Sequence, residues 1–200
     1  KANRTDKNTR LLRLTGSATA TLGSGAVLQN NRWVNRNLSG AVFVTNGGSM
    51  TMEAGSVIQN CEGVYGAAVS LYINAENTLT MNGGEIRNNH ATGRVNDVAG
   101  AVFVGGGSTL TMSGDAAIKD NTTDVQGNGA GVSTYAGAVI ELTGGAVITG
   151  NTIDSIPSNL YLRGDTILTV RGELTGQVGI TDGWAGAQNI SGERFGLAIS

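Results

Sequence analysis

A short motif of apolar and hydroxyl residues returns about every thirty residues along this chain, and that period constrains the fold more than any other feature. Successive copies start 30, 29, 31, 30 and 28 residues apart. The six copies are TATL (19–22), SMTM (49–52), TLTM (78–81), TLTM (109–112), VIEL (139–142) and ILTV (167–170). A fixed period of this length indicates a stacked repeat fold, because one short unit cannot bury its apolar face alone.

Two further motifs keep the same period. The second follows each of the first five copies, as GAVLQNN (25–31), GSVIQNC (55–61), GEIRNN (84–89), AAIKDN (116–121) and GAVITGN (145–151). The third precedes the first motif, as GAVFV (40–44), AAVSL (67–71), GAVFV (100–104), AGVST (130–134) and NLYL (159–162). Three short β-rich runs per repeat predict an all-β, three-sheet, single-stranded parallel β-helix of about six rungs.

Within each run, the two-residue period of a strand separates an inward file from an outward file. The inward positions of the first motif are all apolar and form two columns: Ala20, Met50, Leu79, Leu110, Ile140 and Leu168, then Leu22, Met52, Met81, Met112, Leu142 and Val170. The outward positions between them are mainly threonine: Thr21, Thr51, Thr80, Thr111, Glu141 and Thr169. This alternation predicts a continuous apolar core beneath a hydroxyl-rich face.

The second motif ends in a column of amide side chains. An aliphatic column comes first, at Leu28, Ile58, Ile86, Ile118 and Ile148. Three residues later stand Asn31, Cys61, Asn89, Asn121 and Asn151. Because stacked amides bond the turns above and below, we predict an internal asparagine ladder. Cys61 is then a buried small side chain, since no basic group in the sequence is placed to activate its thiol.

Composition excludes several classes of function. The formal charge of −2 comes from 13 basic and 15 acidic side chains spread along the chain, so there is no basic face for nucleic acid. One cysteine and one histidine exclude an intrachain disulfide and a cysteine or multi-histidine metal centre. No apolar run reaches the length of a membrane span, so we expect no direct membrane insertion, and we expect no cofactor.

The succession of Gly-Ala-Val, Thr-Leu-Thr-Met, Gly-Gly and Ile-x-x-Asn over residues 11–180 resembles the right-handed β-helix repeats of bacterial cell-surface proteins. Among these are Gram-positive adhesins, and the repeats are similar to those of polymorphic outer-membrane protein passengers. The resemblance, with the right-handed crossover rule, implies a right-handed, pectin-lyase-like solenoid. It also implies an extracellular module of a longer surface-anchored chain, with a host protein or glycan as partner. Residues 1–10 are then a polar edge and residues 181–200 a C-terminal strand or cap.

We expect this module not to be an enzyme. The alternative is a carbohydrate-active lyase or hydrolase, which needs grouped carboxylates. Glu141 has no acidic neighbour in its column. The best mixed cluster sets Glu85 near Asp115, with Arg87 stacked on Lys119, and solvent-facing positions explain it without a cleft.

Two weaker alternatives also arise from the columns. The Thr-x-Thr files resemble the flat face of β-solenoid ice-binding proteins, although threonine is favoured on any exposed strand. One acid stands in each of the last three connections, at Asp97, Asp124 and Asp154, and if aligned these could hold Ca²⁺. The calcium-binding nonapeptide is absent, so we predict no metal site.

Outward aromatic residues of the third motif give the predicted ligand site. Phe43, Phe103 and Tyr161 share one outward position, and Trp33, Arg32 and Arg36 lie in an adjoining connection. Exposed rings often mark a partner site, so these six residues are the candidate ligand-binding set. The open alternative is that the connections fold back over the rings and seal a second core.

Overall fold

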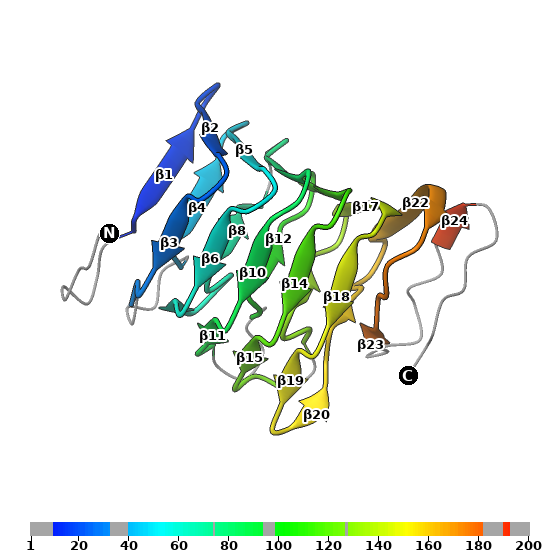
Figure 1. The fold of residues 1–200 in the computed structure, drawn as a ribbon. Helices are drawn as coiled ribbons and strands as arrows, with labels where there is room; N and C mark the ends of the chain where they lie inside the picture. The colour runs from blue at the N-terminus through cyan, green and yellow to red at the C-terminus, as the bar shows by residue number, and fades with distance from the viewer. Residues whose placement is uncertain are drawn as a thin grey trace.

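The computed structural model describes residues 10–32, 40–73, 75–93, 99–126 and 128–181, and the backbone of 190–192. Within these residues every regular element is a strand, and the strands stack from the N-terminal to the C-terminal end (Figure 1). All pairings between them are parallel except β19 with β20. The predicted all-β parallel β-helix is confirmed. Two sheets have seven strands and two have five, so the solenoid has about five complete turns rather than six.

Sheet B carries the first motif, with the predicted register. Its strands are β2 (Thr19–Leu22), β5 (Ser49–Met52), β9 (Thr78–Met81), β13 (Thr109–Met112), β17 (Val139–Gly144), β22 (Ile167–Leu174) and β24 (Ile190–Gly192). Met50 pairs with Leu79, which pairs with Leu110, and all three side chains are fully buried. The second column, from Met52 to Val170, is buried as well. Residues of neighbouring turns therefore pack directly on one another, which gives the core its continuity.

Sheet C carries the second motif in strands β3 (Val27–Gln29), β6 (Val57–Gln59), β10 (Glu85–Arg87), β14 (Ala117–Lys119) and β18 (Val147–Thr149). Its central residues form the predicted aliphatic column. Ile58, Ile86 and Ile118 are fully buried, whereas Leu28 in the first turn is partly exposed.

Sheet A carries the third motif in strands β1 (Leu12–Thr15), β4 (Val42–Thr45), β8 (Val69–Leu71), β12 (Val102–Val104), β16 (Val132–Thr134), β21 (Leu160–Tyr161) and β23 (Ile180–Thr181). Val42, Val69 and Val102 stack in register and belong to the main core. The predicted outward position is also confirmed, because Phe43 pairs with Ser70 and Ser70 with Phe103.

A fourth sheet, D, corrects the prediction of three strands per turn. It consists of two-residue strands, β7 (Glu62–Gly63), β11 (His90–Ala91), β15 (Thr122–Thr123), β19 (Thr152–Ile153) and β20 (Ile156–Pro157). Figure 1 shows β11, β15, β19 and β20 along the lower edge of the stack. In four turns the chain therefore enters a short strand directly after the ladder position, at β7, β11, β15 and β19.

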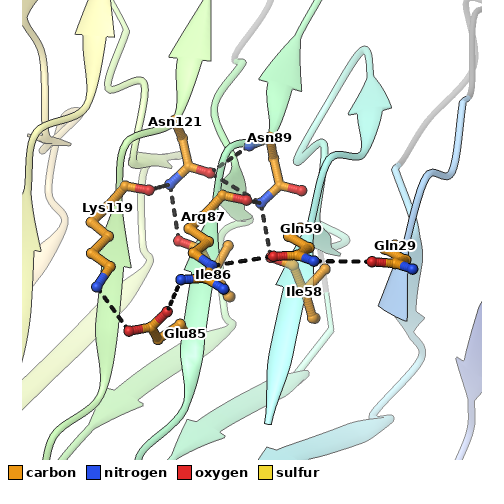
Figure 2. A network of polar contacts seen from close by, with 9 residues as sticks. All are labelled: Gln29, Ile58, Gln59, Glu85, Ile86, Arg87, Asn89, Lys119 and Asn121. Carbon is orange, nitrogen blue, oxygen red and sulfur yellow. Dashed lines mark hydrogen bonds and ion pairs between the residues drawn. The ribbon is translucent and has the colours of Figure 1, made fainter. Parts of the chain in front are cut away.

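Buried asparagines hold the turn between sheets C and D, as predicted. Asn89 donates to Asn121 Oδ1 from its backbone N–H at 2.9 Å and from Nδ2 at 3.0 Å. Asn121 donates in the same way to Asn151 Oδ1, at 3.0 and 2.8 Å. Asn121 Nδ2 also reaches the carbonyls of Ile86 and Lys119 (Figure 2). Each amide therefore ties two turns together.

The residue before each ladder position has a left-handed backbone. The five residues are Asn30, Asn60, Asn88, Asp120 and Gly150, with φ between 53° and 68°. Asparagine, aspartate and glycine tolerate this conformation best among the amino acids. The paired asparagines of the sequence thus have separate roles, since the first bends the chain and the second builds the ladder.

Asn159 extends the ladder beyond the predicted members. Asn151 donates to Asn159 Oδ1 from its backbone N–H and from Nδ2, each at 3.0 Å. Asn159 follows Asn151 by only 8 residues, because the antiparallel pair of β19 and β20 returns the chain at once. Ladder membership is therefore set by position in space and not by the thirty-residue period.

Cys61 is the one thiol of the chain and interrupts the ladder. It is 1% exposed, as predicted, and its N–H donates to Asn89 Oδ1 at 3.0 Å. Its side chain supplies no amide oxygen to the turn before. Within the described residues Asn31 Nδ2 is accordingly buried without an acceptor. Burial raises the pKa of the Cys61 thiol to about 11, so the neutral form prevails.

The predicted terminal segments lie largely outside the described residues. The described residues begin at Arg10, two positions before the start of β1, so the polar edge of residues 1–10 is described only at Arg10. Of residues 181–200, Thr181 belongs to β23 and Ile190–Gly192 form β24, which pairs with β22.

Candidate functional site

The aromatic rings predicted as an exposed ligand site point away from the main core but are covered. Phe43 and Phe103 are each 4% exposed and Tyr161 is 8% exposed. The Tyr72 ring lies 5.6 Å from that of Phe43, and the Tyr65 ring lies 6.1 Å from that of Phe103. The expectation that these rings are exposed is therefore wrong.

A small second cluster of buried apolar residues lies apart from the main core. Its apolar members are Ala67, Ala91, Ala99 and Val125, which are at most 2% exposed. Ala91 belongs to β11, so the fourth sheet contributes directly. The outer side of sheet A is therefore an interior surface along these turns, because alternation predicts direction but not cover.

Of the two predicted arginines, the structure describes Arg32, which pairs with an acidic side chain. Arg32 Nε lies 2.8 Å from Glu62 Oε2 at the edge of sheet D. The cation over the Phe43 ring is Arg10, with its guanidinium carbon 4.3 Å from the ring centroid. Trp33 and Arg36 lie outside the described residues.

An open hollow remains on this side, at the turns that follow β16 and β21. It has a volume of about 370 Å³ and is lined by Tyr135, Ala136, Tyr161, Arg163 and Gly164. Tyr135 is 42% exposed, and the Arg163 guanidinium carbon lies 5.6 Å from its ring centroid. Tyr161 thus keeps an edge on open surface, unlike Phe43 and Phe103. We call this the Tyr135 hollow.

Neither Tyr135 nor Arg163 stands out in the repeat motifs, because each follows the third motif by one residue. The register nevertheless places them opposite each other, since Ser133 pairs with Tyr161 two residues earlier. The same column holds Gly105 one turn before. Extending the outward columns one residue past each copy of the third motif is the signal that could have found this site.

A pair of buried hydroxyls fixes the backbone beneath the hollow. Thr134 Oγ1 and Thr166 Oγ1 lie 2.8 Å apart, and both residues are at most 1% exposed. Thr134 Oγ1 accepts from the Arg163 N–H at 2.9 Å and donates its one proton to Thr166 Oγ1, with the Tyr161 carbonyl also 3.0 Å away. Thr166 Oγ1 donates to the Arg163 carbonyl at 2.7 Å. The backbones that carry Tyr161 and Arg163 are therefore held in place before any ligand arrives.

A second, smaller hollow of about 160 Å³ adjoins the first, because Tyr161 lines both. Its polar lining consists of Gln126, Asn128, Ser158 and Thr181, and its apolar lining consists of Ile153, Ile156 and Pro157. Ile156 is 64% exposed, the highest value among the exposed large apolar side chains. The two hollows together offer aromatic, aliphatic, amide and hydroxyl groups to one ligand.

The mixed cluster on sheet C is a chain of mutually satisfied polar groups (Figure 2). Glu85 pairs with Arg87 at 2.9 Å and with Lys119 at 2.8 Å. Arg87 Nε donates to Gln59 Oε1 at 3.2 Å, and Gln59 Nε2 donates to Gln29 at 2.9 Å. The sheet register sets Ala117, not Asp115, beside Glu85. Two cations therefore bracket a single carboxylate, as in a solvated structural network.

Sheet D brings a hydroxyl, an imidazole and a carboxylate together, which the repeat motifs did not predict. His90 Nδ1 lies 2.8 Å from Thr122 Oγ1, and His90 Nε2 lies 3.3 Å from Asp124 Oδ2. The order matches that of a nucleophile, base and orienting acid. The His90 and Asp124 side chains are 40% and 63% exposed, so water screens their interaction.

The aspartates considered for calcium have separate partners. Asp124 contacts His90, Asp154 accepts a hydrogen bond from Gln126 at 2.7 Å, and Asp97 lies outside the described residues. Among the residues that the structure describes, no group of three or more acidic, histidine or cysteine side chains could hold a metal ion.

The outer face of sheet B carries the predicted threonine files. Thr51 pairs with Thr80, and Thr80 pairs with Thr111. The file continues to Glu141, which accepts hydrogen bonds from Arg171 and thus breaks the hydroxyl pattern with an ion pair.

No protein-family description, curated protein or solved structure matches this chain. In the described part of the chain, no helix has the length and apolar character needed to cross a membrane.

Proposed function

We propose that this chain is a non-catalytic recognition module of a bacterial surface protein, located outside the cell, that binds a host protein or glycan. The observation that carries the proposal is the Tyr135 hollow. An exposed ring and a guanidinium group stand side by side there on a fixed backbone. Tyrosine and arginine are the side chains that most often dominate interface energies.

The scaffold supports a binding role because its turns cannot easily rearrange. The ladder amides restrain the chain before it enters sheet A. The buried pair of Thr134 and Thr166 restrains it where it leaves sheet A. A site on such a framework loses little conformational entropy on binding. Binding residues placed on the turns of a rigid scaffold are a common solution for recognition.

The charged clusters support a non-catalytic role. Glu85 and Glu141 both lie in ion pairs with basic side chains. Glycoside hydrolysis needs two carboxylates, one as acid and one as nucleophile or base, on either side of a sugar. A carboxylate held between Arg87 and Lys119 favours structure over proton transfer to a substrate.

Binding is tested on glycan and host-protein arrays with the wild-type chain, Tyr135→Ala and Thr51→Ala. We expect one ligand class to bind, and we expect Tyr135→Ala to weaken it at least tenfold, about 1.4 kcal/mol. Thr51→Ala changes the outer face of sheet B, outside the Tyr135 hollow, and serves as the matched control. Loss of binding on Thr51→Ala alone would place the docking face on sheet B. If the wild-type chain binds nothing on the glycan array and nothing on the host-protein array, a recognition role is contradicted.

Catalysis is tested by incubating the chain with neutral and uronic-acid polysaccharides, with and without Ca²⁺. We expect no release of reducing ends or unsaturated products. Sustained turnover that disappears in Glu85→Gln would support the carbohydrate-active alternative. Turnover of an ester substrate that disappears in His90→Ala would instead make the group around Thr122 an active site.

A further inference from the structure

The Tyr135 hollow contains a positive charge that the fold itself does not neutralise. Among the described residues no carboxylate lies within ion-pair distance of Arg163, although Arg32, Arg87 and Arg171 all have acidic partners. The nearby Asp165 accepts a hydrogen bond from the Gly137 N–H at 2.6 Å and so serves the turn. The guanidinium group is thus available to an anion, and its fork suits a carboxylate best.

The ring beside this charge selects a flat, partly apolar partner. Tyr135 presents 42% of its surface, and the preceding turn has Gly105 at the equivalent position, so no side chain occupies that place in the column. Sugar rings present C–H groups on their faces and hydroxyls at their edges. An aromatic ring buries such a face, while its own hydroxyl stays in water.

The extent of the hollow indicates a chain rather than a single small molecule. The main hollow, of about 370 Å³, has the second hollow as its neighbour, since Tyr161 lines both. The second offers an amide at Gln126 and a hydroxyl at Thr181, which suit the edge hydroxyls of an adjoining sugar. Both hollows are open to solvent, so a polymer can bind there through its internal units and does not need to present a chain end.

We infer that the Tyr135 hollow binds a uronic-acid unit within an acidic polysaccharide, with the carboxylate on Arg163 and the sugar ring on Tyr135. This inference rests on the proposed recognition function and names its ligand class. The carboxylate and the stacked face must be presented by the same sugar, because Arg163 and Tyr135 are already in contact. A neutral glycan lacks the first feature, and an acidic peptide lacks the second.

The test is calorimetric titration of the whole chain with a galacturonic-acid hexamer and with the same hexamer methyl-esterified at its carboxylates. We expect the free acid to bind at least about tenfold more tightly than the ester. Arg163→Gln should remove that difference, and Tyr135→Ala should weaken both ligands. Arg171→Gln alters net charge equally on an exposed arginine paired with Glu141, and should leave both affinities unchanged.

Each outcome separates the ligand class from the general function. Equal affinity for acid and ester, or acid binding that Arg171→Gln weakens as much as Arg163→Gln, overturns the uronic-acid inference. Binding of a sialylated glycan or a protein at Tyr135, without hexamer binding, also overturns it but leaves the recognition function intact. If neither hexamer nor any array ligand binds, the inference and the proposed function fail together.

Discussion

The asparagine ladder has a complete half and an interrupted half. From Asn89 to Asn151 every amide oxygen accepts from the turn before, and every amide nitrogen donates to the turn after. At the step from Asn31 to Cys61 a thiol replaces the amide, and Asn31 Nδ2 is left buried without an acceptor in the described structure. One cysteine in place of asparagine therefore removes hydrogen bonds from two turns, because each ladder amide accepts from the residue of the turn before.

Breaking the complete half should give the largest effect. Asn121→Ala removes the acceptor of two donors on Asn89 and frees the buried carbonyl of Ile86. Each buried group left unsatisfied costs about 1–3 kcal/mol, so we expect the free energy of unfolding to fall by about 3 kcal/mol or more. Urea denaturation followed by circular dichroism measures this. A loss below about 1 kcal/mol would contradict the structural role of the ladder.

The second largest effect should be a loss of unfolding free energy at alkaline pH, caused by Cys61 in the interrupted half. Burial raises the pKa of Cys61 from 9.0 to about 11, so the unfolded chain releases its thiol proton before the folded chain does. The corresponding stability is present below about pH 9 and is lost as the pH rises through about 11, up to roughly 2–3 kcal/mol. Urea denaturation across this range measures the loss. Cys61→Ala is the control and should show a flatter profile; parallel profiles would contradict the prediction.

Repairing the interruption should stabilise the protein. In Cys61→Asn the new amide oxygen can accept from Asn31 Nδ2, as Asn121 accepts from Asn89. We expect a gain of about 1 kcal/mol in unfolding free energy, the usual value of one buried hydrogen bond. Thermal melting compares this variant with Cys61→Ala, which removes the thiol without supplying an acceptor. Equal melting temperatures for the two variants would exclude the repair.

The smallest effect should come from removing the unpaired amide itself. Asn31→Ala deletes a buried nitrogen that already has no acceptor, so it should cost less than about 1 kcal/mol. The same urea experiment compares the loss of unfolding free energy in Asn31→Ala with that in Asn121→Ala. The Asn121 side chain makes every ladder bond in the wild-type protein. Similar losses for the two variants would show that ladder position, and not hydrogen bonding, determines stability.

The repeat columns were predictable because residue type and period agree at every position. Apolar side chains such as Met81 recur in step, and amides such as Asn121 recur three residues after an isoleucine. The fourth sheet was not predictable, since strands such as β11 and β15 are two residues long and carry no alternation. Of the predicted ligand set, Tyr161 lines the Tyr135 hollow, whereas Phe43 and Phe103 are buried, and their burial was not predictable because it depends on neighbouring chain segments.

The buried hydroxyls of Thr134 and Thr166 are a second feature that the repeat pattern did not predict. The pairing of Thr134 with Thr166 joins two turns through side chains that the pattern treats as ordinary strand and turn residues. Their burial follows from the neighbouring turns and has no local signal in the sequence. The hollow they support lies where the outward column of β16 and β21 continues past the strands.

Stacking strands across the axis determines how far this chain can extend. One turn uses about thirty residues and advances by one strand spacing, about 4.8 Å, or about 0.16 Å per residue. An α-helix advances about 1.5 Å per residue and an extended strand about 3.3 Å. A rod built this way gains little reach from each added repeat but a large increment of lateral surface. Repeat number in such a chain therefore controls the area available for display far more than the distance it spans.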